Sequence, residues 1–556
     1  MLKKIRISLS VIFFSLITLL FLDFTGTLHV WFGWMAKIQF LPAVLALNVG
    51  IIVFLVLLTL LLGRVYCSVI CPLGVFQDMV ARIGRRGKKL PYTFSPAKSW
   101  LRVGVLALFI VAIIAGVSVI VSLLEPYGSF GRMANNLLLP VWQLTNNLLA
   151  LLAERLDSYA FYSTEVWIRS LPTFIVAVVT FVVVAVLAWR NGRTYCNTIC
   201  PVGTFLGLCS HFSLFQIRVD EQKCKKCTLC ARHCKASCID SKAGKIDNSR
   251  CVACMNCIEK CSYGAIGYRF ALPFKMGEIG EMGKMGEIGE VGETGEVGET
   301  GKPGEIEKNE ETVNPDKSAK TVEPDKTNVG ARHALPNPED PGNEGRKAFL
   351  ATSLILASSA LKAQIVPQAT DIKMDGGLAD IIKKQSPRRQ TPLTPAGSLS
   401  DRNMKRKCTA CQLCVTVCPN DVLRPSMSLD TFMQPVMSFE RGYCRPECVK
   451  CSEVCPSGAI TQICKCKKSS TQIGHAVWHR KRCIPIRDEV ECDNCARHCP
   501  TDAITMIPSV PGNEKSLKIP AINEALCIGC GACEYLCPAR PLSAIQVEGH
   551  QIHKII

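Results

Sequence analysis

The chain has 556 residues, of which 32 are cysteine, and its formal net charge at pH 7 is +18. A hydrophobic content of 48% is too high for a mainly disordered chain, and the length and the long apolar runs exclude a small secreted scaffold held by disulfides. Aromatic residues make up only 7% and form no stacking pattern, so the positive charge does not indicate a nucleic-acid partner.

Four apolar runs lie in the first 200 residues, and the last three contain no charged residue. Those three are long enough to cross about 30 Å of hydrocarbon. Lys3, Lys4 and Arg6 place the N-terminus in the cytoplasm, and seven basic residues put the loop between the second and third runs on the same side. We therefore predict an α-helical membrane bundle with four transmembrane helices, in a domain over residues 1–205. The runs are residues 7–22, 40–62, 103–124 and 171–189.

An internal repeat follows the second and fourth runs. Residues 63–76 recur as 192–205 with nine of fourteen positions identical, and each copy contains an Arg-x-Tyr-Cys-x3-Cys-Pro turn. The duplication should bring four thiols together at one membrane face: Cys67, Cys71, Cys196 and Cys200. They are the candidate catalytic residues, and they could bind an additional metal or cluster or act as a redox dithiol pair. Alternatively, they are plain reduced thiols, and the proline only shapes a helix end.

Residues 206–271 contain two cysteine runs with the spacing of bacterial ferredoxins. In that pattern three closely spaced cysteines bind one [4Fe–4S] cluster, and the fourth binds the neighbouring cluster. The predicted ligand sets are Cys224, Cys227 and Cys230 with Cys261, and Cys251, Cys254 and Cys257 with Cys234. Neither Cys234 nor Cys261 precedes a proline, which departs from the usual pattern. Cys209 and Cys238 fall outside it and are expected to be buried thiols.

Residues 365–556 contain four further runs of the same kind. The same exchange predicts four more clusters. Their ligand sets are Cys408, Cys411, Cys414 and Cys455; Cys444, Cys448, Cys451 and Cys418; Cys483, Cys492, Cys495 and Cys537; and Cys527, Cys530, Cys533 and Cys499. Cys483 is the weakest assignment because eight residues separate it from Cys492, and Cys464 or Cys466 could take its place. Both regions should fold as α+β bacterial-type ferredoxin modules, with two and four [4Fe–4S] clusters. Six clusters in a row are more than a structural role requires, so they favour electron conduction.

The two halves are joined by residues 272–345, where glycine recurs every third residue over 277–304, mostly as Gly-Glu-x. This composition predicts a flexible acidic linker. Residues 346–364 then combine Arg346 and Lys347 with a short apolar stretch, which is similar to a twin-arginine export signal. The segment could instead be a fifth membrane anchor or a cytoplasmic helix. If it is exported or inserted, residues 365–556 lie outside.

Residues 1–270 resemble the NapH family, which is related to the membrane parts of NosR and CcoG, and residues from 346 onward resemble the NapG/MauM family. The chain is therefore similar to a NapH–NapG fusion. We expect a multi-pass protein of the bacterial inner (cytoplasmic) membrane. The basic residues predict a cytoplasmic first ferredoxin, and export or insertion of residues 346–364 would make the C-terminal ferredoxin periplasmic. The resemblance implies a quinol dehydrogenase that takes electrons from (mena)quinol in the membrane quinone pool. Its electron acceptor would be a terminal reductase or cytochrome.

Two other classes of function stay open from the sequence. One is a metal-handling or maturation factor of the CcoG type, in which the repeated turns reduce or pass on copper. The other is a redox-sensing regulator. Asn48, and His29 with Asp23, are candidate proton acceptors for quinol oxidation, although polar residues at such places are commonly structural. No motif in the chain names the terminal electron acceptor.

Overall fold

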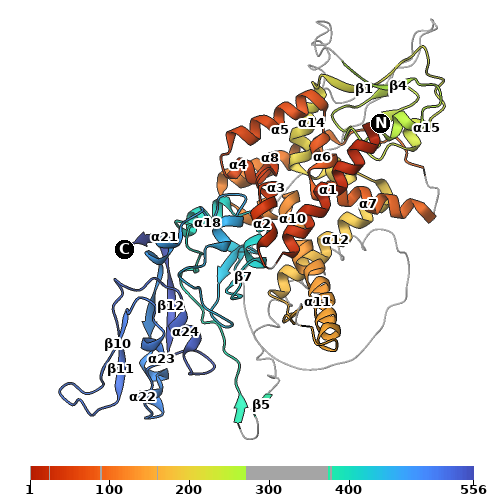
Figure 1. Ribbon diagram of the computed structural model, residues 1–556. Helices are drawn as coiled ribbons and strands as arrows, with labels where there is room; N and C mark the ends of the chain where they lie inside the picture. Colours follow the sequence, from red (N-terminus) through yellow and green to blue (C-terminus); the bar gives the residue numbers. More distant parts are fainter. Residues whose placement is uncertain (1, 24, 88–90, 159–160, 271–372, 376–378) are drawn as a thin grey trace, which may run out of the picture. The chain divides into compact units, whose positions relative to one another are not determined.

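The computed structural model describes every residue except 1, 24, 88–90, 159–160, 271–372 and 376–378 (Figure 1). The predicted linker and almost all of the signal-like region, residues 272–345 and 346–364, lie outside the described residues. Contacts divide the chain into two units, one of Met1–Phe274 with Ile382–Ile556 and one of Lys275–Ile381. The described part of the second unit is an antiparallel hairpin of β5 (Lys373–Asp375) and β6 (Ala379–Ile381).

Two helices in the described part of the chain are long and apolar enough to cross a membrane, α1 (Leu2–Leu22) and α12 (Leu171–Asn191). Each has 21 residues, or about 32 Å at 1.5 Å per residue, which matches a hydrocarbon layer of about 30 Å. Only about a quarter of their apolar windows is buried by the rest of the protein. Such open apolar faces suit a lipid environment better than the core of a soluble protein.

The second and third apolar runs are interrupted, so the structure differs from the prediction of four transmembrane helices. Residues 40–62 form α4 (Phe40–Leu45) and α5 (Val49–Leu62), because Leu47 has a φ of 55° and the Asn48 side chain caps α5 by accepting from Ile51 N at 3.3 Å. Residues 103–124 fall in α8 (Ser99–Ala115) and α9 (Ser118–Leu124), because Gly116 has a φ of 76° and ends α8. The apolar composition predicts helices in both runs, as the structure shows, but it does not predict the backbone breaks.

The sequence repeat is also a structural repeat. In the first copy α5 is followed by the short helix α6 (Val65–Val69) and then by α7 (Pro72–Gly87). In the second copy α12 is followed by α13 (Thr194–Thr198) and α14 (Pro201–His211). Gly63 and Gly192 end the first helix of each copy with φ values of 71° and 72°, which a side chain would disfavour. The other helices here are α2 (Thr27–Phe32), α3 (Trp34–Lys37), α10 (Pro126–Met133), a π-helix (Ala134–Leu138) and α11 (Leu139–Glu154).

The first ferredoxin region, residues 206–270, has short elements around its cysteines. Strands β1 (Phe215–Val219) and β4 (Ile266–Phe270) pair antiparallel, with Phe215 opposite Phe270. A second antiparallel pair is β2 (Ile239–Asp240) with β3 (Lys245–Ile246). Helices α15 (Leu229–Arg232) and α16 (Asn256–Lys260) each carry the third cysteine of a run.

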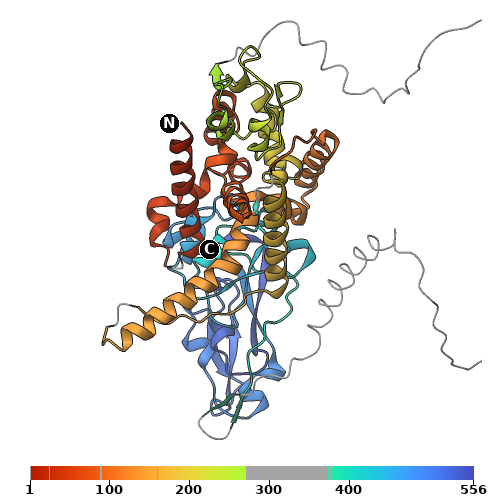
Figure 2. The same cartoon turned by 90° about the vertical axis from the view of Figure 1, so that its right-hand side faces the viewer.

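The C-terminal ferredoxin region, residues 382–556, has the same character and lies at the blue end of the colour scale (Figure 2). Its helices are α18 (Asp401–Lys407), α19 (Leu413–Thr416), α20 (Lys450–Val454), α21 (Lys465–Ser469), α22 (Ile484–Arg487), α23 (Asn494–Arg497) and α24 (Ala532–Leu536), with 3-10 turns at Leu429–Thr431 and Arg480–Arg482. Its strands form the antiparallel pairs β7 (Leu423–Pro425) with β8 (Pro435–Met437), β9 (Thr471–Trp478) with β12 (Ile545–Ile555), and β10 (Ile504–Pro508) with β11 (Lys518–Ile522).

Helix α1 has one ferredoxin region at each end. At its start Lys3 forms an ion pair with Glu259 of the first region. Just after its end the carbonyl oxygen of Thr25 accepts a hydrogen bond from Lys450 of the C-terminal region at 2.9 Å.

Helix α12 runs between the same two regions. Before its start Arg169 lies 3.4 Å from the carboxylate of Asp421 in the C-terminal region. After its end the backbone N–H of Arg193 donates to the carbonyl oxygen of Lys235 in the first region at 2.9 Å. Both candidate membrane spans therefore join the two regions.

Candidate iron–sulfur centres

Four of the six predicted ligand sets each line one small cavity. The sets are Cys224, Cys227, Cys230 and Cys261; Cys418, Cys444, Cys448 and Cys451; Cys499, Cys527, Cys530 and Cys533; and Cys483, Cys492, Cys495 and Cys537. Each set combines three cysteines of one run with the fourth cysteine of its partner run. The fold thus makes the exchange that the spacing predicts.

The remaining two sets are brought together as well. Cys414 lies within electrostatic range of Cys408, Cys411 and Cys455. Cys257 has the same relation to Cys234, Cys251 and Cys254. The donor chemistry at all six places is four thiols, which is the ligand set of a [4Fe–4S] cluster.

Four of the six runs share a backbone turn that explains how they fit a cluster. In each, the second and fourth residues after the first cysteine have positive φ. Neighbouring right- and left-handed residues direct successive N–H groups toward one point and form an anion-binding nest. A cube with four thiolate ligands is such an anion. The residues are Lys226 and Thr228, Ala253 and Met255, Ala410 and Gln412, and Gly529 and Gly531.

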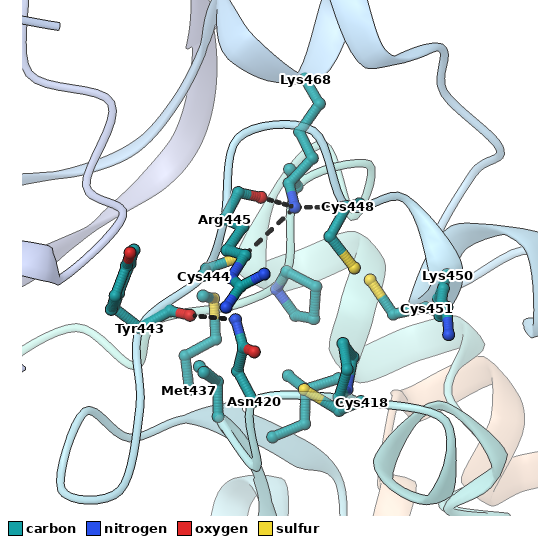
Figure 3. Close-up of a pocket in the computed structure, with 15 residues that line it drawn as sticks. Cys418, Asn420, Met437, Tyr443, Cys444, Arg445, Cys448, Lys450, Cys451 and Lys468 are labelled. Atoms are coloured by element: carbon teal, nitrogen blue, oxygen red, sulfur yellow. Dashed lines mark hydrogen bonds between the residues drawn. The ribbon is translucent and has the colours of Figure 1, made fainter. Parts of the chain in front are cut away.

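The thiols of Cys418, Cys444, Cys448 and Cys451 face one cavity beside the buried Lys468 (Figure 3). The Lys468 ammonium donates to the Cys444 sulfur at 3.2 Å and to the carbonyl oxygens of Arg445, at 2.8 Å, and Cys448. Burial alone would lower the pKa of Lys468, but the neighbouring Cys444 raises it. The lysine is therefore held as a cation against a cluster ligand.

Replacing Lys468 by methionine should lower the reduction potential of the cluster at Cys444, because hydrogen bonds to ligand sulfur and nearby positive charge favour the reduced, more negative state. Potentiometric EPR titration of the purified protein measures this shift. Lys467→Met is the matched control, since the Lys467 side chain is exposed. Equal titration curves for Lys468→Met and the wild type would show that Lys468 has no such effect.

The structure separates Cys483 from its two competitors. Cys464 and Cys466 form a disulfide with each other, whereas Cys483 lines the cavity of its predicted set. The eight-residue gap is filled by α22 and the loop after it.

Cys238 lies beside two predicted cluster ligands, although its sequence position falls outside the ferredoxin spacing. It is buried, as expected, but its sulfur lies 3.5 Å from that of Cys234, and it also hydrogen-bonds to Cys251. The signals in the sequence were a second three-residue gap, from Cys234 to Cys238, and the missing proline after Cys234. Cys209 is half-buried on α14.

The four cysteines of the repeated turns also come together. Cys67, Cys71, Cys196 and Cys200 are free thiols that are 4–5% exposed. The side-chain amide of Gln77 in the first copy donates to the Cys196 sulfur of the second at 3.2 Å. Burial raises the pKa of Cys71 and of Cys200, so an isolated thiol there would stay protonated.

The arginine of each turn reaches across to the other turn. Arg64 donates to the carbonyl oxygen of Cys196 at 3.2 Å, and Arg193 donates to that of Cys67 at 2.7 Å. Both arginines are at most 1% exposed. The exchange fixes the two turns against each other with a pseudo-twofold arrangement.

The glycine two residues after the proline of each turn permits the two turns to pack this closely. A Cβ atom at Gly74 would lie 2.2 Å from the Cys67 carbonyl oxygen, and one at Gly203 would lie 2.4 Å from that of Cys196.

We expect Gly74→Ala to displace the first turn and to lower the yield of folded, iron-loaded protein several-fold. Gly104→Ala is the control, because no atom lies within 4 Å of its Cβ position. Iron content and size-exclusion profiles measure the effect, and normal iron loading in Gly74→Ala would contradict this account of the turn.

The candidate proton acceptors have structural roles. Asn48 caps α5, and the Asp23 carboxylate accepts hydrogen bonds from the backbone of Gly26 and Leu28 and contacts His29 at 3.2 Å.

Sequence reasoning missed Glu125, which is 1% exposed and caps α10. Burial raises the pKa of Glu125 to about 7. A buried carboxyl group that titrates near neutrality is typical of proton-transfer sites.

These features define an iron–sulfur protein with ferredoxin-type domains. A 4Fe–4S binding domain model matches residues 45–91 and 172–219, and each matched segment contains one copy of the repeat. A 4Fe–4S dicluster domain model matches residues 490–540, and another 4Fe–4S binding domain model matches residues 404–424.

The similar proteins include ferredoxin-type and electron-transport proteins. An uncharacterized protein of Methanocaldococcus jannaschii is 35% identical over 15% of this chain and 33% of its own length. YccM of Escherichia coli, named for electron transport, is 25% identical over 40% of this chain and 55% of its own length. The methylamine utilization ferredoxin-type protein MauM of Methylobacillus flagellatus is 28% identical over 26% of this chain and 64% of its own length. The chain thus spans between a third and two thirds of these relatives. No solved structure matches it.

Proposed function

We propose that the protein is a membrane quinol dehydrogenase that passes electrons from (mena)quinol through [4Fe–4S] clusters to a periplasmic reductase or cytochrome. The observation that carries this proposal is that α1 and α12, the two candidate spans, each join one ferredoxin region to the other. Ferredoxin regions at opposite ends of helices of membrane length suit electron transfer through the membrane domain, from one face to the other. The similarity to ferredoxin-type electron-transport proteins supports the same class.

The proposal includes four membrane crossings, a cytoplasmic first ferredoxin and a periplasmic C-terminal ferredoxin. The basic residues Lys3, Lys4 and Arg6 lie at the end of α1 that contacts the first region, which favours a cytoplasmic position for that end. The interrupted pairs α4 with α5 and α8 with α9 supply the other two crossings. Broken helices are common where membrane proteins bind substrates or ions.

The six cysteine sets described above are the proposed cluster ligands. Each cluster, when bound, stores and releases a single electron with little structural change. A quinol that becomes a quinone releases two electrons and two protons, so a series of one-electron sites can separate its two electrons. The protein's own residues hold the clusters, exclude water and take the protons, for which Glu125 is our candidate acceptor.

A cavity of about 410 Å³ is our candidate quinol site. Its size is within the range of small-molecule sites. Arg169 and Ser170, just before α12, line it together with residues of the C-terminal region. Met437 lines this cavity and also the one that holds Cys418, Cys444, Cys448 and Cys451. A quinol head in the cavity would therefore be separated from a cluster by one side chain.

Blocking this cavity should impair quinol oxidation. Met427 lines it and is 54% exposed, so Met427→Trp would fill the space without disturbing a core. We expect kcat/KM for a menaquinol analogue to fall at least tenfold, measured with an artificial electron acceptor. Leu429→Trp is the control, because Leu429 is a nearby exposed residue outside the lining. Equal activity of Met427→Trp and Leu429→Trp would show that quinol does not bind in this cavity.

The test of the function is to mix the purified, cluster-loaded full chain with reduced menadiol under anaerobic conditions and to record EPR spectra. Appearance of reduced-cluster signals is the expected result. Loaded clusters that no quinol reduces, although dithionite does, would overturn the quinol dehydrogenase proposal.

A further inference from the structure

We infer that Cys67, Cys71, Cys196 and Cys200 bind a seventh [4Fe–4S] cluster, which connects the two ferredoxin regions electrically. This inference rests on the proposed electron-transfer function and deepens it. It adds a site to the six ferredoxin sets and gives a chemical role to the duplicated turns.

The four thiols suit a cube better than a single ion. All four are free and buried, and the two copies of the repeat contribute two each. Within the described ranges of the chain, no three His, Cys, Asp or Glu side chains approach as closely as one metal ion requires, and in this respect the turn cysteines resemble the six ferredoxin sets. A cube binds each thiolate through a different iron atom, so its ligands stand further apart than those of one zinc or copper ion.

Buried cations outnumber carboxylates around the turns, and this excess favours a bound anion. Arg6, Arg193 and Lys235 are all buried and share one carboxylate, that of Asp78, at 3.3, 2.7 and 2.8 Å. Arg64 is 0% exposed, and its acceptors among the described residues are a side-chain amide, two backbone carbonyls and the Cys67 sulfur at 3.8 Å.

Four buried cations against one carboxylate would be costly without further negative charge. A [4Fe–4S]2+ cube with four thiolates carries a charge of about −2, which supplies the missing negative charge at the place where Arg64 and Arg193 cross. Neutral thiols would leave this excess uncompensated. The charge balance therefore favours a bound cluster over four protonated cysteines.

The four turn cysteines also lie between the two ferredoxin regions. On one side, Asn197 of the second turn donates to the carbonyl oxygen of Ala236, two residues from the proposed ligand Cys234, at 3.2 Å. On the other side, the Tyr195 hydroxyl donates to the carbonyl oxygen of Leu124 at 3.5 Å, beside Glu125.

The path from Glu125 continues to the C-terminal region. A Cβ atom at Gly128, on α10, would lie 2.6 Å from Glu125 and 2.6 Å from the carbonyl oxygen of Thr409, between Cys408 and Cys411. One continuous core of buried side chains contains Cys254 of the first region, all four turn cysteines, and Cys411 and Cys414 of the C-terminal region.

Electron tunnelling decays exponentially with distance, so a hydrocarbon layer of about 30 Å needs an intermediate carrier. The proposed step is a one-electron exchange in which a reduced [4Fe–4S]+ cluster becomes [4Fe–4S]2+ and its neighbour gains that electron. No covalent bond forms or breaks, and no proton is needed for this step. The donor and the acceptor are the ferredoxin clusters of the proposed function.

A copper-transfer role for the turns fits less well. Cargo transfer requires a partner to reach the ligand sulfurs, whereas each of these cysteines is at most 5% exposed. Cu(I) with two thiolates carries one negative charge and would compensate less of the cationic excess. Metal analysis in the experiment below distinguishes the two.

The test compares the full chain, purified and reconstituted without oxygen, with Cys71→Ser/Cys200→Ser and with the control Cys209→Ser. Seven cubes contain about 28 iron atoms, and loss of one leaves about 24. We expect about 28 iron and sulfide per wild-type chain and per Cys209→Ser chain, and about 24 in the double variant, with one EPR signal missing. A wild type with about 24, unchanged in the double variant, overturns the inference and leaves the proposed function intact. Wild-type protein without any [4Fe–4S] signal would overturn both the inference and the proposed function. Wild-type protein with about 24 iron atoms and with copper that the double variant lacks would overturn the inference.

Arg64→Met keeps all four cysteines and guards against a double variant that fails to fold. Removal of a buried cation beside an anionic cluster disfavours the reduced state. The EPR signal of the seventh cluster should therefore titrate at a lower potential in Arg64→Met. That signal is the one missing from the double variant or, if the double variant does not fold, the one present in addition to the six ferredoxin signals. Unchanged titration of every cluster in Arg64→Met would contradict the placement of a cluster between the crossed arginines.

Discussion

Replacing Asp78 by asparagine is expected to destabilise the protein by about 3–5 kcal/mol, the usual cost of leaving buried charges without their partner. Asp78 is on α7, and its partners come from three other places: Arg6 on α1, Arg193 at the second turn and Lys235 in the first ferredoxin region. The thermal unfolding midpoint in detergent should fall sharply, and the first ferredoxin region should become sensitive to protease.

The matched control is Asp488→Asn. Asp488 also forms an ion pair, with Arg487 at 2.6 Å, but both side chains are at least 40% exposed. Exposed pairs contribute little, so this variant should unfold at the wild-type temperature. Equal unfolding midpoints for Asp78→Asn and Asp488→Asn would show that the ion pairs of Asp78 do not hold α1, α7, the second turn and the first ferredoxin region together.

The effect of Asp78 should depend on pH in one direction. Burial alone would raise the pKa of Asp78, but Arg193 and Lys235 hold it well below its ordinary value of 3.8. A carboxyl group whose folded-state pKa is depressed stabilises the protein above its unfolded-state pKa, and this stability is lost as the pH falls toward the folded-state pKa. The difference between the wild type and Asp78→Asn should therefore be constant above about pH 5 and shrink below about pH 4.

Removing iron is expected to unfold the C-terminal ferredoxin region. Its longest helix in residues 382–556, α18, has seven residues, and the others have four or five, far below the length at which an isolated helix is stable. Its buried core includes Cys411, Cys414, Cys527 and Cys533 themselves. Loss of the clusters removes the groups around which these residues pack.

Limited proteolysis with mass spectrometry measures this effect. After treatment with ferricyanide and a chelator, residues 382–556 should be digested, whereas α1 and α12 should persist in micelles and retain their helical circular dichroism. The untreated chain is the control. A C-terminal region that resists protease without iron would show that its fold does not depend on the clusters.

The ligand sets were predictable because cluster binding leaves a local signal: three fixed gaps and a fourth cysteine in the partner run. The fold adds the positive φ values at Lys226, Thr228 and their equivalents, which explain why those gaps suit a cube. The repeat and the candidate spans were visible for the same reason, since both are patterns within short windows. The breaks at Leu47 and Gly116 were not predicted, because hydropathy reports the preference for lipid and is insensitive to backbone direction.

The parts that sequence reasoning missed depend on long-range contacts. Arg64 and Arg193 were read as part of a motif, but their exchange across the repeat requires the three-dimensional arrangement of both copies. Lys468 follows Cys444 by 24 residues, and nothing in that spacing indicates a bond to its sulfur. Glu125 looked like a loop residue at the end of an apolar run, and only its burial between α9 and α10 shows its raised pKa.

The central claim is that electrons pass between ferredoxin regions at opposite ends of α1 and α12. The most direct measurement uses quinone-free proteoliposomes with cytochrome c trapped inside and a reduced flavodoxin, which cannot cross the membrane, added outside. Trapped cytochrome c should be reduced in vesicles with the wild type, and not in protein-free vesicles or in those with Cys71→Ser/Cys200→Ser. Failure of the fully iron-loaded wild type to reduce it faster than protein-free vesicles would contradict the account.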